Sequence, residues 1–426
     1  MPAQRNNTTA ILIIGFLFFI FGFVTWLNGS LIQFLKLVCQ LETDIQAFFV
    51  TSAFYLAYFC LAIPSSYILK RTGFKNGMAL GLFVMAIGSV IFIPAAQNRS
   101  FALFLTGLFV QATGLTLLQT ASNPYISIIG PIESAAKRIS IMGICNKTAG
   151  IISPFILSAV LLSNATELET KISKAKAADK DALLNALAGR VIGPYIIMAI
   201  VLAVLAFLLT KSPLPEIDVD KEEGKTTTAT AAHKKSILQF PHLLLGVLCL
   251  FLYVGVEVMA GDAIGIYGKA MGMPLDETKN FTMFTLAAML VGYVVGIFTI
   301  PKIISQQTAL KLSAILGILF SIAVYATDGY VAITFIALLG LANALMWPAI
   351  FPLAIDGLGK FTKIGSALLI MGIAGGAVIP PIYALLKDKK GLNMPNHLAF
   401  FICMLPCYLY ILYYAVKGYK AGKQPA

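Results

Sequence analysis

Twelve long runs of apolar residues, separated by shorter polar stretches, form the main pattern of this sequence. An α-helix needs about 20 such residues to cross the hydrocarbon core of a bilayer, and each run has about that length. The pattern therefore predicts an all-α membrane protein with twelve transmembrane helices. The runs cover residues 10–38, 47–69, 76–96, 101–129, 138–163, 191–210, 240–268, 280–300, 308–327, 330–355, 362–386 and 397–416.

A polar stretch of low complexity separates the sixth run from the seventh. It contains a highly charged segment at residues 218–225 and a threonine-rich segment at 226–230, a composition typical of flexible linkers. We therefore expect an N-terminal six-helix bundle over residues 1–210, a cytoplasmic linker over 211–239 and a C-terminal six-helix bundle over 240–426.

The two halves repeat weakly. The segment Ile-Met-Gly-Ile at 141–144 recurs at 370–373, and the same offset places Asn28 opposite Glu257. Duplicated bundles that face each other across a central cavity are a recurrent plan of membrane transporters. The repeat therefore favours a transporter built from two pseudo-symmetric bundles.

The composition excludes a soluble globular protein. Hydrophobic residues make up 58% of the chain and charged residues only 12%, and the mean hydropathy is +0.86. Soluble domains average roughly 45–50% apolar and about 25% charged residues. The net charge of +12 does not indicate nucleic-acid binding, because the lysines and arginines are spread over short loops. Their bias towards the loops on one side predicts that both termini are cytoplasmic.

Three other features narrow the function further. The six cysteines form no CxxC pair, which argues against a disulfide framework or a metal site. His233, His242 and His397 are scattered, so no catalytic cluster is indicated and we do not expect an enzyme. The absence of a GxxxxGK[ST] phosphate loop argues against ATP as the driving force within this chain. We expect no bound cofactor.

Polar side chains in the middle of the fourth run predict a site at membrane depth. Thr116, Gln119 and Asn123 follow each other at i, i+3 and i+7, so they share one helical face. An unpaired polar group in hydrocarbon costs several kcal/mol. This face must therefore point into the bundle, where it either bonds another helix or lines a water-filled cavity.

Two clusters combine an amide with an aromatic ring, the mixture that binds the hydroxyls and the apolar face of a sugar. Trp26 and Asn28 lie in the first run, and Asn343 and Trp347 lie four residues apart in the tenth. These are the only two tryptophans of the chain. For the first cluster, a helix-packing Gly29 with a locally satisfied Asn28 is the alternative interpretation. For Trp347 the alternative is a tryptophan of the membrane interface, which its position well inside the run disfavours.

Charged residues at depth complete the candidate site. Asn146 and Lys147 lie well inside the fifth run, where an unpaired cation costs at least ~2.5–3.5 kcal/mol. Glu257 is the deepest acid of the chain, and a carboxyl beside a lysine would take up and release a proton as access alternates. A structural Glu257–Lys147 ion pair is the alternative. Asp262 lies nearer the end of its run, where we expect it to be solvated.

Several segments resemble the major facilitator superfamily, in particular its fucose and glucose/galactose symporter family. The likeness covers nearly the whole chain and includes Phe54-Tyr-Leu-Ala-Tyr58, Leu118-Gln-Thr-Ala-Ser-Asn-Pro-Tyr125 and Tyr253-Val-Gly-Val-Glu-Val258. The segments at 26–31 and 142–147 look most like the N-acetylglucosamine permease branch of that family.

The resemblance implies twelve helices in two six-helix bundles, alternating access, and cation-coupled uptake of a monosaccharide across a bacterial inner membrane. Two positions depart from the fucose-type pattern. That pattern has acids, assigned there to proton handling and sugar recognition, where this chain has Gly29 and Gln119. Proton coupling by that route does not carry over to this chain.

The prediction is a secondary active transporter that imports N-acetylglucosamine or glucose/galactose together with a proton. Sodium coupling, uniport, drug efflux and a sugar sensor that does not transport remain alternatives. We expect the partners to be a sugar, the coupling ion and membrane lipid, and the protein to be a monomer. The predicted sugar ligands are Trp26, Asn28, Gln119, Asn123, Asn146, Glu257, Asn343 and Trp347, and the predicted coupling residues are Glu257 and Lys147.

Overall fold

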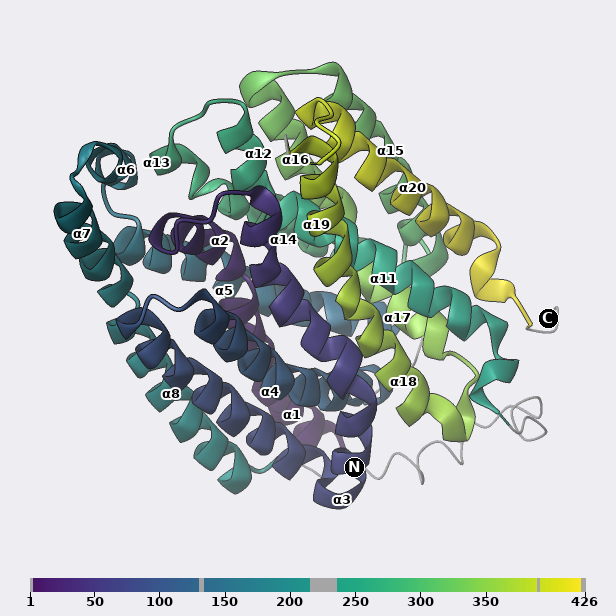
Figure 1. The fold of residues 1–426 in the computed structure, drawn as a ribbon. Coiled ribbons are helices and arrows are strands. Elements are labelled where there is room, and N and C mark those ends of the chain that lie inside the picture. Colours follow the sequence, from purple (N-terminus) through teal and green to yellow (C-terminus); the bar gives the residue numbers. More distant parts are fainter. Residues whose placement is uncertain (1–2, 130–133, 215–235, 389–390, 423–426) are drawn as a thin grey trace.

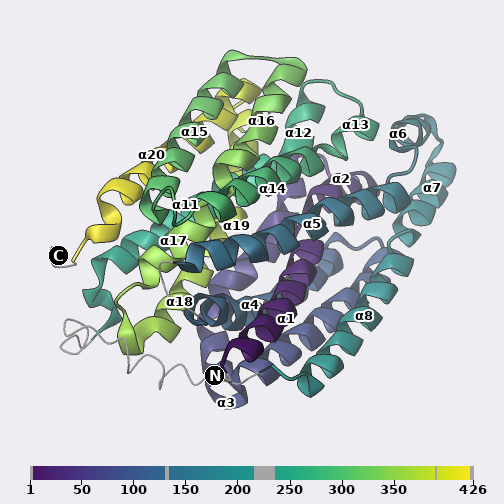
Figure 2. The same cartoon turned by 180° about the vertical axis from the view of Figure 1, so that it is seen from behind.

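The computed structural model describes residues 3–129, 134–214, 236–388 and 391–422, and the regular structure within these ranges is entirely helical. The helices of the N-terminal half gather on one side of the molecule and those of the C-terminal half on the other (Figures 1 and 2). The N-terminal half contains α1 (Ala3–Thr25), α2 (Asn28–Val38), α3 (Asp44–Gln97), α4 (Phe101–Ile128), α5 (Ala135–Leu161), α6 (Ala165–Lys174), α7 (Ala177–Gly189) and α8 (Ile192–Lys211).

The C-terminal half follows the linker region. The linker expected over 211–239 falls largely on residues 215–235, which lie outside the described residues. The longer helices of this half are α11 (Pro241–Gly261), α12 (Ile264–Ala270), α14 (Phe281–Thr299), α15 (Gln306–Ala326), α16 (Gly329–Asn343), α17 (Met346–Ile355), α18 (Thr362–Met371), α19 (Gly375–Lys387) and α20 (Asn396–Val416). A single-turn helix, α13 (Leu275–Thr278), precedes α14, and the 3-10 turn Gly372–Ala374 joins α18 to α19.

Within the described residues, eleven helical segments are long and apolar enough to cross a membrane. One of them, α3, has 54 residues and contains a sharp break at Gly73, where φ is 76° and ψ is 173°. Glycine adopts this positive φ without a steric penalty. Gly77 also lies against the side chain of Leu69, because a Cβ added to Gly77 would collide with it. These two residues are eight positions apart, and in a straight helix they would be separated by about 12 Å along the axis. The chain therefore folds back at Gly73, and α3 supplies two spans, which confirms the twelve predicted.

Four of the expected spans are interrupted. The first is split between α1 and α2 at Trp26–Leu27, the seventh between α11 and α12 at Asp262–Ala263, and the tenth between α16 and α17 at Ala344–Leu345. In the eleventh, the 3-10 turn replaces one turn of α-helix. Apolar composition alone shows the length of a span, so the sequence pattern did not reveal these breaks. The breaks in the first, seventh and tenth spans lie next to buried polar residues.

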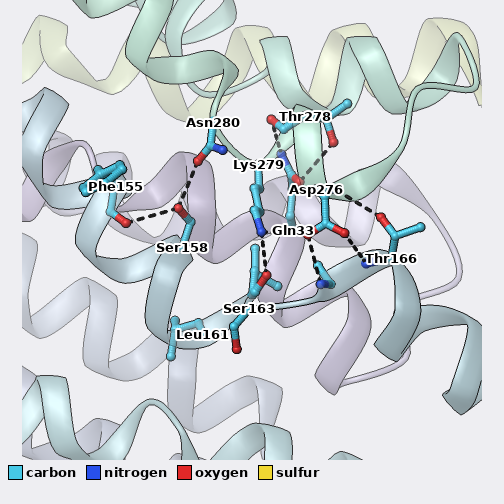
Figure 3. A network of polar contacts seen from close by, with 12 residues as sticks. Gln33, Phe155, Ser158, Leu161, Ser163, Thr166, Asp276, Thr278, Lys279 and Asn280 are labelled. Atoms are coloured by element: carbon cyan, nitrogen blue, oxygen red, sulfur yellow. Dashed lines mark hydrogen bonds and ion pairs between the residues drawn. The ribbon is translucent and has the colours of Figure 1, made fainter.

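Helices α6 and α7 lie outside the spans at one end of the molecule, and a polar network there joins the two halves (Figure 3). The carboxylate of Asp276 accepts hydrogen bonds from the backbone N–H groups of Ala165 (3.1 Å) and Thr166 (3.0 Å), the first residues of α6. Lys279 Nζ lies 2.7 Å from the same carboxylate and donates to the carbonyl of Leu162. A helix N-terminus favours an anion, so Asp276 anchors α6 to the C-terminal half.

Candidate functional site

A cavity lies where the two halves meet. Its wall comes from α1, α3, α4 and α5 of the N-terminal half and from α11, α14, α17 and the 3-10 turn of the C-terminal half. It encloses about 680 Å³ of empty space, part of which is open to solvent.

Seven of the nine residues predicted for the site line this cavity. They come from three spans of the N-terminal half and two of the C-terminal half, which no local sequence pattern would bring together. The seven are Trp26, Gln119, Asn123, Asn146, Lys147, Glu257 and Trp347. The other two, Asn28 and Asn343, do not line it.

Asn343 lies in the interior of the C-terminal half. It is fully buried, and its Oδ1 accepts a hydrogen bond of 2.8 Å from the hydroxyl of Tyr408 on α20. The sequence placed Asn343 and Trp347 on one helical face, but the break between α16 and α17 separates them. Trp347 faces the cavity and stacks on Phe351, with 5.9 Å between ring centroids. Asn343 therefore joins α16 to α20 within the C-terminal half and does not line the cavity.

Of the three residues predicted to form a polar face on α4, two, Gln119 and Asn123, line the cavity. Gln119 Nε2 donates to the hydroxyl of Tyr58 at 3.0 Å, and Asn123 Nδ2 donates to the carbonyl of Gln119. The Oδ1 of Asn123 is buried and makes no hydrogen bond with any described residue, so it can accept one from a ligand. Thr116 instead donates to the carbonyl of Ala112 within its own helix.

Trp26, Asn146 and Lys147 form one connected group. The indole Nε1 of Trp26 donates to Asn146 Oδ1 at 3.1 Å. The ammonium of Lys147 lies 4.0 Å from the centroid of the Trp26 ring, within the range of a cation–π interaction. These contacts hold the indole at the break between α1 and α2 and leave part of it on the cavity wall.

The structure contains the ion pair that the sequence suggested. Lys147 Nζ donates to Glu257 Oε1 at 2.9 Å and so joins α5 to α11 across the two halves. The Lys147 side chain is 6% exposed and that of Glu257 is 12% exposed. Pairing replaces the hydration that both charges lose on burial.

Two polar side chains near this pair, those of Asp262 and Asn28, do not lie where the sequence analysis expected them. Asp262 was expected to be solvated, but it is only 1% exposed and neither carboxyl oxygen makes a hydrogen bond with a described residue. The reason is the break after α11, which directs the carboxyl towards the N-terminal half. Asn28 is also fully buried, and its amide makes no hydrogen bond within the described part of the chain.

Sequence reasoning missed most of the aromatic part of the wall, because these rings lie within apolar runs and resemble core residues. Tyr55 and Tyr58 stack on each other with ring centroids 6.3 Å apart, and they are three residues apart on one face of α3. Tyrosines at that spacing in the middle of a span are the signal that could have identified them. The rings that were missed are Phe18, Phe21, Tyr55, Tyr58, Tyr253 and Tyr293.

A second cavity lies at the α6 end and has a different character. Its wall includes Lys36, Asp44, Glu169 and Lys269, but no aromatic ring. Among the described residues, no group of three or more histidines, cysteines, aspartates or glutamates could hold a metal ion. The aromatic and amide-lined cavity is therefore the candidate site.

Comparison with known proteins agrees with this architecture. The profile of the Major Facilitator Superfamily matches residues 11–381. A glucose/galactose transporter of Brucella abortus is 34% identical over 428 residues, which cover 98% of this chain and 96% of that protein. The L-fucose-proton symporter of Escherichia coli is 28% identical over 383 residues, 89% of this chain and 87% of that protein.

Solved structures show the same fold. The major facilitator transporter FucP in the outward conformation superposes with a TM-score of 0.76 at 25% identity, covering 99% of this chain and 100% of that chain. The proton:xylose symporter XylE reaches a TM-score of 0.69 at 13% identity, over 96% of this chain and 95% of its own. These matches confirm the predicted fold and the expectation of a transporter rather than an enzyme. The chain belongs to the major facilitator superfamily, whose members cross the membrane many times.

Proposed function

We propose that this protein imports a monosaccharide across a bacterial inner membrane by alternating access, coupled to the entry of a proton. The cavity between the halves carries the proposal, because it combines three amide side chains with eight aromatic rings. The relatives named as glucose/galactose and L-fucose-proton transporters support this choice over drug efflux. We place both termini in the cytoplasm and regard the monomer as the working unit.

The sugar would lie between the two tryptophans and the face of α4. Trp26 and Trp347 offer flat apolar surfaces for the C–H face of a pyranose ring. Asn123 Oδ1, which lacks a hydrogen-bond partner among the described residues, would accept from one hydroxyl, and the amide of Gln119 would turn from Tyr58 towards another. Because these groups belong to both halves, a sugar bound here would favour closure of the halves around it.

The Lys147–Glu257 pair would connect the cavity to the driving force. The pair bridges the halves in this structure, so it must separate when they rock apart on that side. A membrane potential of 100 mV supplies ~2.3 kcal/mol for each charge that moves across. One coupled cation would therefore support a roughly fifty-fold sugar gradient.

Intrinsic fluorescence tests sugar binding directly, because both tryptophans of the chain line the cavity. Titration of the purified protein with glucose, galactose, L-fucose and N-acetylglucosamine should change the emission for the sugar that binds. Trp26→Phe and Trp347→Phe would assign the change to one ring. No response to any sugar, together with no transport, would refute the proposal.

Counterflow in proteoliposomes tests transport and separates a transporter from a sensor. Vesicles loaded with unlabelled sugar should take up labelled sugar transiently against its gradient. The relatives favour glucose or galactose, while the segments at 26–31 and 142–147 led us to N-acetylglucosamine. Competition by each sugar ranks the two possibilities. Fluorescence binding without counterflow would indicate a sensor.

The coupling ion is tested by imposing one gradient at a time. Accumulation driven by an inward proton gradient without sodium supports proton symport. A requirement for sodium would identify a sodium symporter, and counterflow without accumulation under either gradient would identify a uniporter. Glu257→Gln should abolish proton-driven accumulation and spare exchange, whereas unchanged accumulation would remove Glu257 from the coupling role.

A further inference from the structure

Asp262 is a buried acid that the proposed sugar site does not use. It caps the end of α11 and is 1% exposed, and neither carboxyl oxygen has a hydrogen-bond partner among the described residues. It does not line the cavity. Burial strongly disfavours an ionised carboxylate that has no partner. The burial of an acid without a hydrogen-bond partner therefore needs a physical reason.

The space around the carboxyl depends on Gly29 of α2. A Cβ at this position would lie 3.4 Å from Asp262 Oδ1 and 2.5 Å from Thr282 Oγ1, so only glycine lets α2 approach this closely. The backbone N–H of Gly29 faces the carboxyl but does not complete a hydrogen bond with it. The hydroxyls of Thr282 and Thr285 already donate to the carbonyls of Gly261 and Ala260, at 2.8 and 2.7 Å. Neither hydroxyl hydrogen remains available to the carboxylate.

Trp26 packs against Gly261, the residue before Asp262, and also lines the sugar cavity. Its ring is enclosed by two glycines from opposite halves. A Cβ on Gly150 of α5 would lie 2.5 Å from Trp26 Cδ1, and one on Gly261, next to Asp262, would collide with the same ring. Because part of this indole lines the cavity, movement of the ring on sugar binding would change the surroundings of the carboxyl.

The charges around Asp262 do not balance. Three charged groups act on one another here: Lys147 from α5, and Glu257 and Asp262 from α11. Tyr55 on α3 also faces the two acids, but its phenol is neutral at ordinary pH. The Lys147 ammonium compensates one carboxylate, that of Glu257, at 2.9 Å. The buried cluster therefore lacks one positive charge.

We propose that Asp262 is the binding site of the coupling proton. A proton from water on the open side would bond to one carboxylate oxygen of Asp262, which gives a neutral acid and a neutral cluster while the halves are closed. On the other side the O–H bond would break and the proton would leave to water. One charge would thus enter with each sugar. This inference rests on the proposed function and adds the residue that carries the ion.

The surroundings favour a proton over sodium. A hard metal cation needs several oxygen ligands and the space to hold them. The carbonyls of Gly261 and Ala260, the two residues before Asp262, each already accept a threonine hydroxyl, and Gly29 brings α2 close to the carboxyl. A proton needs only one lone pair of the carboxylate.

The test is Asp262→Asn, which keeps the size of the side chain and removes its charge. In proteoliposomes we expect counterflow to stay within about three-fold of wild type, while sugar accumulation under a proton gradient falls to the equilibrium level. Asp181→Asn is the matched control, because Asp181 is an exposed partner of Arg99, and it should accumulate sugar like wild type. Proton-driven accumulation by Asp262→Asn, or accumulation in wild type that needs sodium instead, would overturn the proposal.

Infrared difference spectroscopy provides a second readout that does not depend on transport. Wild-type protein at neutral pH should show the band of a protonated carboxyl that shifts on sugar addition and is lost in Asp262→Asn. If that variant fails to fold, Asp262→Ser serves instead. No such band in wild type, or a band that persists in the variant, would assign the proton elsewhere. Absence of counterflow in wild type would instead refute the sugar transporter itself, so the two failures are distinguishable.

Discussion

Two of the ion pairs that join the halves differ in how far their side chains are exposed to water. The Lys147–Glu257 pair beside the cavity has side chains that are 6% and 12% exposed. At the α6 end, the side chains of Lys269 and Glu169 are 38% and 39% exposed. Exposed pairs contribute about 0–1 kcal/mol, whereas breaking a buried pair by removing one partner costs about 3–5 kcal/mol.

This difference indicates a division of roles. At the α6 end, the exposed Lys269–Glu169 pair can separate and re-form at little cost. The Lys387–Asp44 pair, which joins α19 to α3 at the same end, has side chains that are only 6% and 12% exposed and is costly to break. The inner pair is expensive to break on its own, so its separation needs compensation from bound sugar or a bound ion. We therefore expect the exposed Lys269–Glu169 pair to act in gating and the inner Lys147–Glu257 pair in coupling, and the following changes test that expectation.

The largest effect is expected for Lys147→Met. This change leaves Glu257 and Asp262 buried without a cation, so the free energy of unfolding should fall by about 3–5 kcal/mol and counterflow should be lost. Chemical unfolding in detergent and counterflow measure both. Lys269→Met at the α6 end is the matched control and should change stability by at most about 1 kcal/mol. Equal effects of the two variants would contradict the comparison.

A smaller effect is expected at the inner indole. Trp26→Leu removes the stacking surface and the cation–π contact with Lys147, and an aromatic contact is worth about 0.5–1.5 kcal/mol. Sugar affinity should fall by up to about ten-fold, measured by the remaining Trp347 fluorescence. Phe351→Leu is the control, because it removes a ring that packs against Trp347 without lining the cavity. An unchanged affinity in Trp26→Leu would remove the indole from the sugar site.

Two amides that looked alike in the sequence should separate in their effects. Gln119→Leu removes a cavity amide, and the loss of one hydrogen bond should weaken sugar binding by about five-fold, or ~1 kcal/mol. Asn343→Leu removes the acceptor of the Tyr408 hydroxyl, so stability should fall by about 1–3 kcal/mol with affinity unchanged. A loss of affinity in Asn343→Leu with normal stability would show that Asn343 reaches the sugar.

The smallest effect is expected for Glu169→Gln. It removes the partner of Lys269, 2.7 Å away, and should change the turnover rate by less than about five-fold without altering sugar affinity, because an exposed pair contributes at most about 1 kcal/mol. High salt should remove the difference from wild type, since exposed charges are screened. If the turnover rates still differ at high salt, the Lys269–Glu169 pair is more buried during transport than in this structure.

The number of spans, the cavity and most of its polar wall could be predicted from the sequence, because polar groups in hydrocarbon need a partner wherever the chain folds. The predictions that differed from the structure share one cause. Asp262 and Asn343 lie next to breaks in helices, and a break turns a side chain away from the face that regular helical spacing assigns to it. The tyrosines of α3 were missed for another reason, since an aromatic residue in an apolar run carries no sign of whether it faces lipid, core or cavity.

The position of the Trp26 ring between Gly150 and Gly261 has a mechanical consequence. One glycine belongs to each half, so the two helix backbones clamp the indole and it can rotate only when they separate. The rotational freedom of this ring should therefore increase when the halves separate and decrease when they close. In a Trp347→Phe protein Trp26 is the remaining tryptophan, so its fluorescence anisotropy would follow the transport cycle.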